Sequence, residues 1–409
     1  MYNIVASALF NFASLIKEEK MSKLFIAGEV FHGAGSLDEL KNIKGKKAVI
    51  VTGGSSMRKS GTLDKAIAYL TEAGIETQIF EGVEEDPSSA TCMKGAEVIQ
   101  NFQPDWIIGL GGCSAIDAAK IMWVFYEYPD ADFEAMIKPF TVPVLRSKAK
   151  FIAIPSTSGT GTETTGLAVI TDREKGVKYP IVSYELTPDI AIIDGEICAS
   201  MPAHVTANTG LDVLTHCVEA YVSNIENNIA DALSKGGLEL VFDNLKEVVE
   251  NPNNIKARQN MHDASFMGGL AFNNAWLGIV HSLSHQVGAL YGIPHGASNA
   301  IFLPNVIRFN AQATERYPEL AKVIGKETTE ELAQAIETLR SEINNQSAIK
   351  EFGISREDWD KNLDYIANNA LVDPCTGFNP RVPSLDELKA IYNACYEGVV
   401  YAEEAAVAG

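Results

Sequence analysis

The sequence predicts two domains, an α/β domain followed by an all-helical domain. Up to about Asp194, short apolar strands alternate with helical stretches, a pattern typical of a parallel sheet that is covered on both faces. After about Pro202, apolar residues recur with helical spacing and no convincing strand follows. The chain has 409 residues, enough for two cores of ordinary size. We therefore expect an N-terminal extension over residues 1–20, an α/β domain over 21–203 and an all-helical domain over 204–409.

The expected strands of the first half are short and mostly apolar. Residues 47–52, Lys-Ala-Val-Ile-Val-Thr, have an apolar centre and lead directly into two glycines. Further strands are expected at residues 76–80, 105–109, 150–154 and 190–193, and helices at 63–73 and 115–123. Near-continuous apolar strands of this kind belong to a parallel sheet that has water on neither face.

The second half contains stretches in which apolar residues repeat every three or four positions, as they do along the buried face of a helix. They cover residues 207–222, 229–249, 255–272, 329–344 and 385–396. Because no strand pattern interrupts them, we expect an all-α domain.

The charge of the chain argues against nucleic acid and membranes as partners. The sequence has 33 Lys and Arg residues against 53 Asp and Glu residues, and no basic run compensates for the formal net charge of −20. No apolar run reaches the roughly 18 residues that span a bilayer, and residues 1–16 lack the basic start of a signal peptide. The six cysteines form no Cys-x-x-Cys pair, which suits a reducing compartment. We therefore expect a cytoplasmic protein.

Glycine-rich loops follow two of the expected strands. Residues 53–55, Gly-Gly-Ser, follow the first strand, and residues 111–114, Gly-Gly-Cys-Ser, lie between the strand at 105–109 and the helix at 115–123. Backbone N–H groups in such loops can approach a pyrophosphate, and the following helix points its positive end at it. Either loop alone is also explained as a tight turn. Together, at one edge of a parallel sheet, they predict a nucleotide site.

A third loop, residues 156–163, follows the expected strand at 150–154 and carries hydroxyl groups that can bond phosphate, ribose or carboxamide. A surface turn rich in Ser and Thr would have the same composition. Asp117 and Lys120 lie on the helix after the second glycine loop. Their simplest interpretation is a carboxylate near a helix start and a solvated charge.

Histidine is scarce in this chain, yet three of its seven histidines, His281, His285 and His295, lie close together in sequence. Asp212 and His216 are four residues apart in an expected helix, so their side chains share one face and can meet one ion. One carboxylate and three imidazoles suit Fe(II), Zn(II), Mn(II) or Co(II) and leave room for an alcohol or aldehyde oxygen. The four candidate ligands are Asp212, His216, His281 and His295.

Each of these residues alone has a simpler explanation. Asp212 could be a buried acid, His216 a core histidine and His295 a turn residue. As a metal ligand, His295 is expected to be presented from a loop, because Pro294 ends the preceding helix. His285 lies one helical turn after the first histidine of the cluster and could relay a proton or only contact a ligand. The remaining histidines, His32, His204 and His262, have no partners in sequence and are interpreted as structural.

Five segments of the chain carry motifs that together resemble one enzyme family. They are residues 109–120 (Gly-Leu-Gly-Gly-Cys-Ser-Ala-Ile-Asp-Ala-Ala-Lys), 156–163, 210–221, 278–301 and 375–381 (Cys-Thr-Gly-Phe-Asn-Pro-Arg). On these motifs the chain resembles the iron-dependent, or group III, alcohol dehydrogenase family, which includes butanol dehydrogenases, lactaldehyde reductases and 1,3-propanediol dehydrogenases. The resemblance runs from roughly Phe25 to Glu397.

The resemblance implies an α/β N-terminal Rossmann-like dinucleotide-binding domain and an all-α C-terminal metal-binding domain, with a cleft between them. Fe(II) or Zn(II) would be held by the four candidate ligands already named. The implied reaction is hydride transfer between NAD(P)H and a small aliphatic aldehyde, with His285 as the catalytic residue that passes a proton. Because members of the family commonly self-associate, a homodimer or larger homo-oligomer is expected.

The resemblance also implies a cofactor site. The positions that match the cofactor contacts of the family are Gly53, Gly54, Ser55, Asp86, Gly111, Gly112, Ser114, Asp117, Thr157, Thr160, Thr162 and Lys178. Members that use NAD carry an acidic residue where this chain has Gly53, and here Arg58 and Lys59 follow close behind. NADP(H) is therefore favoured, with NAD(H) as the alternative.

This chain departs from the pattern of the family at two places. Cys113 stands where the usual motif has a third glycine, so a side chain lies where backbone is expected to approach phosphate. Leu167 occupies a position that is polar in relatives that reduce diols. With Phe272 and Cys375 it favours a pocket for a less polar aldehyde.

Two other classes of function stay open on the sequence alone. The first is a glycerol-dehydrogenase-like or dehydroquinate-synthase-like metalloenzyme of the same architecture, against which the segment at 375–381 counts. The second is a non-catalytic nucleotide-binding structural subunit, against which the complete set of four ligands counts.

Overall fold

The structure is a computed structural model that describes residues 24–173 and 177–402. The chain divides into two compact units. The α/β unit comprises Leu24–Met201 and Pro252–Asn273, and the helical unit comprises Pro202–Asn251 and the described residues from Asn274 onward. The expected N-terminal extension, residues 1–20, lies outside the described residues. None of the helices in the described part of the chain is long and apolar enough to cross a membrane.

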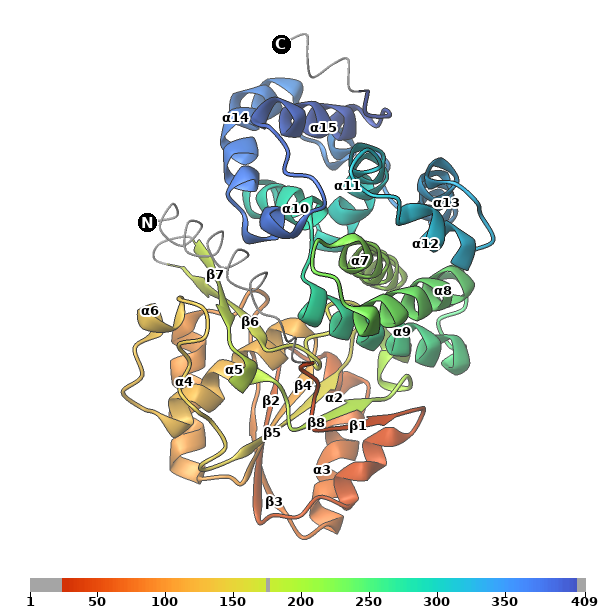
Figure 1. Cartoon of the computed structure of the whole chain (residues 1–409). Coiled ribbons are helices and arrows are strands. Elements are labelled where there is room, and N and C mark those ends of the chain that lie inside the picture. The colour runs from red at the N-terminus through yellow and green to blue at the C-terminus, as the bar shows by residue number, and fades with distance from the viewer. Residues whose placement is uncertain (1–23, 174–176, 403–409) are drawn as a thin grey trace. The chain divides into compact units, whose positions relative to one another are not determined.

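A six-stranded parallel sheet lies at the centre of the α/β unit, with the strand order β1-β8-β5-β4-β2-β3 (Figure 1). Its strands are β1 (Glu29–His32), β2 (Lys47–Thr52), β3 (Glu76–Phe80), β4 (Trp106–Gly111), β5 (Lys150–Pro155) and β8 (Ile190–Ile193). The five strands expected between residues 47 and 193 are confirmed within one or two residues. A strand expected near residues 24–26 is absent, and the first described strand is β1 instead. Strands β4 and β8 are buried along their whole length, which explains why they read as continuous apolar runs.

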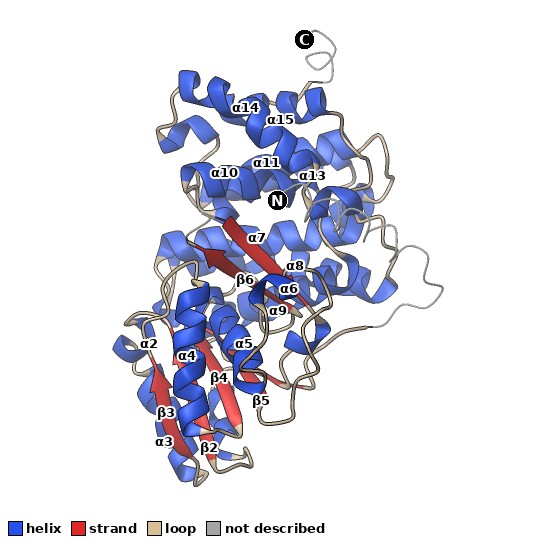
Figure 2. Cartoon of the chain, turned by 90° about the vertical axis from the view of Figure 1, so that its left-hand side faces the viewer, coloured by secondary structure: helices blue, strands red, loops and turns tan. Residues whose placement is uncertain are grey.

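Helices cover both faces of this sheet. Crossovers between parallel strands are right-handed, so α3 (Thr62–Glu72) lies on one face, whereas α4 (Ser89–Phe102) and α5 (Cys113–Glu127) lie on the other (Figures 1 and 2). The fold class expected from the sequence is confirmed. The short helices of this unit are η1 (Ser36–Lys41), α2 (Ser56–Lys59), α6 (Phe133–Met136), η2 (Tyr184–Leu186) and η3 (Ile197–Ser200).

Two of the features of the α/β unit that were not expected from the sequence lie close to its loops. One is an antiparallel pair of strands, β6 (Leu167–Asp172) and β7 (Val177–Val182), outside the main sheet. The other is helix α9 (Ile255–Ala275), whose residues group mostly with the α/β unit although they follow α7 and α8 in sequence. The side chain of Gln259 on α9 accepts a hydrogen bond from Gly195 N at 2.7 Å and donates one to Ile193 O at 3.1 Å. These contacts fasten the helix to the end of β8.

The helical unit contains no β-strand among its described residues. Its helices are α7 (Ala203–Val222), α8 (Asn228–Glu250), α10 (Ile279–Tyr291), α11 (His295–Asn310), α12 (Tyr317–Val323), α13 (Thr329–Glu342), η4 (Ile349–Phe352), α14 (Arg356–Leu371), η5 (Pro374–Phe378) and α15 (Leu385–Glu397). Helix α7 packs against α8 and α11, and α10 packs against α11 and α14. The candidate metal ligands lie on α7, α10 and α11.

Candidate metal centre and cofactor loops

The four candidate metal ligands come from three helices of the helical unit. Asp212 and His216 lie one turn apart on α7, and His281 lies in the first turn of α10. His295 is the first residue of α11, with Pro294 as the N-cap. The expectation that His295 is presented from a loop was therefore wrong. Pro294 follows the end of one helix and also begins the next, since the fixed φ of proline suits a helix start.

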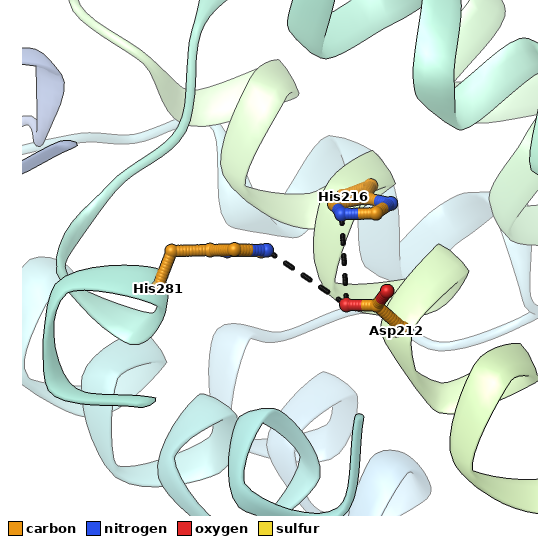
Figure 3. Close-up of side chains that lie close together, drawn as sticks. All are labelled: Asp212, His216 and His281. Atoms are coloured by element: carbon orange, nitrogen blue, oxygen red, sulfur yellow. Dashed lines mark ion pairs between the residues drawn. The ribbon is translucent and has the colours of Figure 1, made fainter. Parts of the chain in front are cut away.

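The ring nitrogens of all three histidines converge on one carboxylate oxygen. The Nε2 atoms of His216, His281 and His295 lie 3.5, 3.8 and 3.6 Å from Asp212 Oδ1. Figure 3 shows His216 and His281 pointing toward the carboxylate. Two ligands that bind one ion tetrahedrally at about 2.1 Å lie about 3.4 Å apart. The spacing therefore fits a single ion such as Fe(II) or Zn(II).

Burial keeps the imidazole of His281 neutral. Asp212, His216 and His281 are nearly inaccessible, whereas the His295 side chain is 40% exposed. Desolvation, together with the neighbouring histidines, lowers the pKa of His281 well below its usual range. A neutral imidazole has a free lone pair on Nε2, as metal binding requires. The cluster is thus closed on one side and accessible at His295.

Glu219 orients His281 and was missed by the sequence analysis. Its Oε2 lies 2.5 Å from His281 Nδ1, and its Oε1 accepts a hydrogen bond from Val280 N at 2.7 Å. Metal-binding histidines commonly donate their second ring N–H to a carboxylate, which leaves the other nitrogen for the ion. Burial raises the pKa of Glu219 to about 8. Its position seven residues after Asp212, on the same face of α7, was a signal that could have revealed it.

Asn299 is a second residue of the centre that sequence reasoning missed. It is fully buried and lies one turn after His295 on α11. Its Nδ2 donates to Asp212 Oδ1 at 2.8 Å and lies 3.2 Å from His295 Nε2. Within the described part of the chain its Oδ1 has no hydrogen-bond partner. The amide nitrogen of Asn299 thus contacts the ligand atoms of Asp212 and His295, and this polar set of donor atoms suits a cation better than an apolar core.

His285 lies beside the ligand cluster, and a carboxylate holds one of its nitrogens. The His285 Nδ1 lies 2.9 Å from Asp373 Oδ2, and the imidazole stacks on the ring of His295 with 5.6 Å between centroids. Partial desolvation opposes protonation of His285, but the charge of Asp373 outweighs it and raises the pKa of the imidazole. With Nδ1 held in this way, Nε2 is the nitrogen free to exchange a proton.

In the α/β unit the two glycine loops lie where the sequence places them. Gly53, Gly54 and Ser55 follow β2, and Gly111 and Gly112 join β4 to α5. Gly111 has φ +149°, and a Cβ there would lie 3.1 Å from Ala115 Cβ, so the tight turn requires glycine. A Cβ on Gly112 would lie 3.8 Å from Thr157 Cγ2, which brings the third loop next to the second. The three loops thus share one edge of the sheet.

The other candidate cofactor residues fall into two groups. Asp86 and Lys178 are exposed and form an ion pair of 2.6 Å, and Ser114 and Thr160 are partly exposed. Asp117 and Thr162 are instead buried and bonded to each other, with 2.7 Å between Asp117 Oδ1 and Thr162 Oγ1. They hold the third loop against α5.

Lys120 is not the solvated charge expected from the sequence. It is fully buried, and its ammonium group donates to the carbonyl oxygens of Thr162, Thr165 and Leu167 at 2.7, 2.8 and 2.8 Å. A buried charge persists only where hydrogen bonds replace its hydration. Lys120 therefore fastens the end of the third loop to the start of β6.

The three expected substrate residues lie in different elements. Leu167 begins β6 and Phe272 lies on α9, both in the α/β unit, whereas Cys375 lies on η5 in the helical unit. Cys375 has its Sγ close to His285 and Asp373. The substrate role of all three stays a prediction.

Of the histidines interpreted as structural, His262 is the best integrated. It is fully buried on α9, with its Nδ1 3.0 Å from Ser158 Oγ and 3.5 Å from Cys198 Sγ. Burial lowers the pKa of His262 to about 4. His32 and His204 are largely exposed.

Family models match both halves of the chain. The model described as iron-containing alcohol dehydrogenase matches residues 27–195, and the model of the C-terminal region of the Fe-containing alcohol dehydrogenase family matches residues 206–396. The candidate ligands and loops all lie within these ranges.

Relatives and solved structures agree with these models. The chain is 46% identical to the NADPH-dependent butanol dehydrogenase of Clostridium saccharobutylicum over 92% of this chain and 99% of that protein. It is 39% identical to the bifunctional aldehyde-alcohol dehydrogenase of Escherichia coli. This match covers 90% of this chain but only 45% of that longer protein. Among solved structures, an iron-containing alcohol dehydrogenase from Thermococcus thioreducens superposes on this chain with a TM-score of 0.87 at 34% identity. The superposition covers 92% of this chain and 100% of that structure's chain.

Proposed function

Because the chain belongs to the iron-containing alcohol dehydrogenase family and is a metal-dependent alcohol dehydrogenase, we propose that it transfers hydride between NADPH and a small aliphatic aldehyde. The observation that carries this proposal is the convergence of three imidazole Nε2 atoms on Asp212 Oδ1 within 3.8 Å. The comparisons favour this reaction over that of a glycerol-dehydrogenase-like or dehydroquinate-synthase-like enzyme, or a structural nucleotide-binding subunit.

NADPH is the proposed cofactor for two reasons. Gly53 leaves the end of β2 without the carboxylate that would repel a 2′-phosphate. The butanol dehydrogenase relative is named as NADPH-dependent. The phosphates would be held by residues 53–55 and 111–114, where N–H groups and the start of α5 face the ligand. Leu167, Phe272 and Cys375 are proposed as substrate residues that favour an aldehyde with few polar groups.

The residues of the helical unit have separate roles in the proposed mechanism. Iron or zinc held by the four ligands would supply a Lewis acid that polarises the carbonyl oxygen of the aldehyde. Glu219 forms a hydrogen bond with Nδ1 of His281 and thereby keeps Nε2 of that ring directed at Asp212. His285, held by Asp373 at Nδ1, is proposed to give a proton from Nε2 as the alcohol forms.

Aldehyde reduction with a chelator as the control tests the proposal. The purified protein should oxidise NADPH with butyraldehyde, and a chelator should abolish turnover until Fe(II) or Zn(II) is restored. NADPH binding without turnover under every metal condition would overturn it and favour a pure binder.

We further propose that the protein works in the cytoplasm as a homodimer or larger homo-oligomer, without nucleic acid or membrane partners. The cysteines within the described ranges are all free, as suits a reducing compartment. Sedimentation velocity of the purified protein tests the assembly, and a single monomeric species at micromolar concentration would contradict it.

A further inference from the structure

We propose that His285, Asp373 and Cys375 form a second metal site that takes a thiophilic divalent cation, such as Zn(II) or Cd(II), and inhibits the enzyme when it is filled. Each residue offers one donor atom, and the three donor atoms lie within 4.8 Å of one another. None of them is a ligand in the cluster built on Asp212. The inhibition rests on the proposed role of His285, whereas the binding does not.

The carboxylate of Asp373 is already oriented as a ligand. Its Oδ1 accepts hydrogen bonds from Cys375 N at 3.0 Å and Ser282 Oγ at 3.4 Å. Its Oδ2 is turned the other way, to His285 at 2.9 Å. Carboxylates that bind ions are commonly fixed through one oxygen by hydrogen bonds of this kind. The Asp373 side chain is 9% exposed, so it has little freedom to turn away.

The two elements that carry the donors are tied to each other. Thr376, next to Cys375 on η5, donates a hydrogen bond to Ser282 Oγ on α10 at 2.8 Å. Asp373 is the N-cap of η5, and its side chain accepts a hydrogen bond from the backbone N–H of Cys375. The His285 side chain is 44% exposed, so a cation can reach the cluster from solvent. The three donor atoms are thus held close to one another, and the cluster is accessible to solvent at His285.

The donor set selects the class of cation. Thiolate, imidazole and carboxylate together favour Zn(II), Cd(II) and Co(II), whereas Mg(II) and Ca(II) prefer oxygen ligands alone. Ligands of one tetrahedral ion lie roughly 3.4–3.8 Å apart. The widest pair of donors must therefore close by up to about 1 Å, and the His285–Asp373 pair, now 2.9 Å apart, must open by about 0.5 Å. Binding releases the Cys375 thiol proton to solvent, and the imidazole keeps one N–H by moving it from Nδ1 to Nε2. No electron is transferred, and the charge of the ion is offset by thiolate and carboxylate.

Filling this site would block the proton transfer assigned to His285, because an imidazole bound to a cation at Nδ1 does not cycle between its protonated and neutral forms. The second cation would also bind more weakly than the first. The rings of His285 and His295 are 5.6 Å apart, so two cations would repel each other at short range. Zinc should therefore support activity at low concentration and inhibit it at higher concentration.

Cobalt spectroscopy tests the binding, because the ligand cluster on Asp212 contains no sulfur. Titration of the full-length protein with Co(II) should produce a thiolate-to-cobalt charge-transfer band in the near ultraviolet only after the first equivalent is bound. Cys375→Ser should lose the band. Cys113→Ser, which removes another partly exposed cysteine, should keep it. A wild-type protein without the band, or a band that persists in Cys375→Ser, would overturn the site.

Zinc inhibition of the metal-loaded enzyme tests the consequence. The activity of each variant at high zinc is expressed relative to the activity of the same variant at low zinc. Asp373→Asn serves as a second variant that keeps the thiol. Both Cys375→Ser and Asp373→Asn should raise the zinc concentration for half inhibition by roughly tenfold or more. Equal inhibition in wild type and both variants would contradict the assignment. A protein that reduces no aldehyde would disprove the proposed function, while the cobalt band would still decide the second site.

Discussion

At the residue scale, the metal centre depends on side chains that do not themselves bind the ion. Glu219 fixes the orientation of His281, and Asn299 donates a hydrogen bond of 2.8 Å to Asp212 Oδ1. Both are buried and polar, and each has its strongest contact with a candidate ligand. Because a buried polar group costs free energy unless it is bonded, their presence indicates that the ligand geometry is specified rather than incidental.

Glu219→Gln tests this support. A cation bound beside His281 favours the ionised form of Glu219, whose charge makes His281 a stronger donor to the metal. The amide cannot supply this charge, so affinity for Fe(II) or Zn(II) should fall roughly 10–100-fold. Competition with a chelator of known affinity measures this directly. Glu239→Gln, an exposed change on the neighbouring helix α8, should leave metal affinity unchanged. Equal affinities in the two variants would show that Glu219 does not act on the centre.

His262 should make the stability of the α/β unit depend on pH. Its folded pKa of about 4 lies below the unfolded value of 6.5, so the unfolded chain binds the extra proton as the pH falls. The stabilisation is complete above pH 6.5 and is lost toward pH 4, on the order of 3 kcal/mol over that window.

Urea denaturation at a series of pH values measures this effect. The midpoint of wild type should fall more steeply with decreasing pH than that of His262→Gln, which cannot take up the proton. His204→Gln, at an exposed position on α7, should behave as wild type. Parallel pH profiles for wild type and His262→Gln would refute the prediction.

At the scale of elements, the third cofactor loop is fixed by close packing on α9. Gly161, in the loop, has φ +61°, and its backbone lies against Gly269 on the helix. A Cβ added to Gly269 would lie 2.8 Å from Gly161 Cα and 2.8 Å from Thr164 Oγ1. Backbone cannot yield as a flexible side chain can, so the loop position requires glycine on both sides.

Gly269→Ala should therefore weaken NADPH binding on the order of tenfold and destabilise the protein by about 1–3 kcal/mol. Alanine normally stabilises a helix by about 1 kcal/mol relative to glycine. Gly288→Ala on α10 is the matched control, because its Cβ would meet only Ile293 O, at 3.5 Å. If both variants bind NADPH as wild type does, the packing of loop on helix is not what positions the cofactor.

The elements also show how far sequence reasoning reaches. The strands of the main sheet could be predicted because their burial makes them continuously apolar. The pairing of Asp212 with His216 could be predicted because helical spacing puts both side chains on one face. The environment of Lys120 could not be predicted, because the residues whose carbonyl oxygens accept its hydrogen bonds lie 42 to 47 positions further along the sequence. The start of α11 at His295 was missed because Pro294 was interpreted only as a helix terminator.

At the scale of the whole molecule, the two kinds of site belong to different units. The candidate ligands Asp212, His216, His281 and His295 all lie in the helical unit, and the candidate cofactor residues all lie in the α/β unit. The grouping of α9 with the α/β unit could not be predicted, because helical periodicity shows which face is buried but not the partner it is buried against.

Metal removal should therefore separate binding from turnover. Chelated protein is expected to keep its NADPH affinity within about twofold, because the cofactor loops contain none of the ligands, while aldehyde reduction is lost. Quenching of tryptophan fluorescence by NADPH, before and after chelation, measures the first quantity. Loss of NADPH binding on chelation would show that the metal is needed for the cofactor site as well.

The most direct test of the account is the metal content of anaerobically purified His281→Ala beside wild type and His204→Ala, with NADPH-dependent butyraldehyde reduction measured on the same samples. We predict about one iron or zinc ion per chain and full activity in wild type and His204→Ala, as expected for a single centre with these ligands. His281→Ala should contain almost no metal and show no turnover. A His281→Ala protein that keeps both its metal and its activity would contradict the assignment of the metal centre.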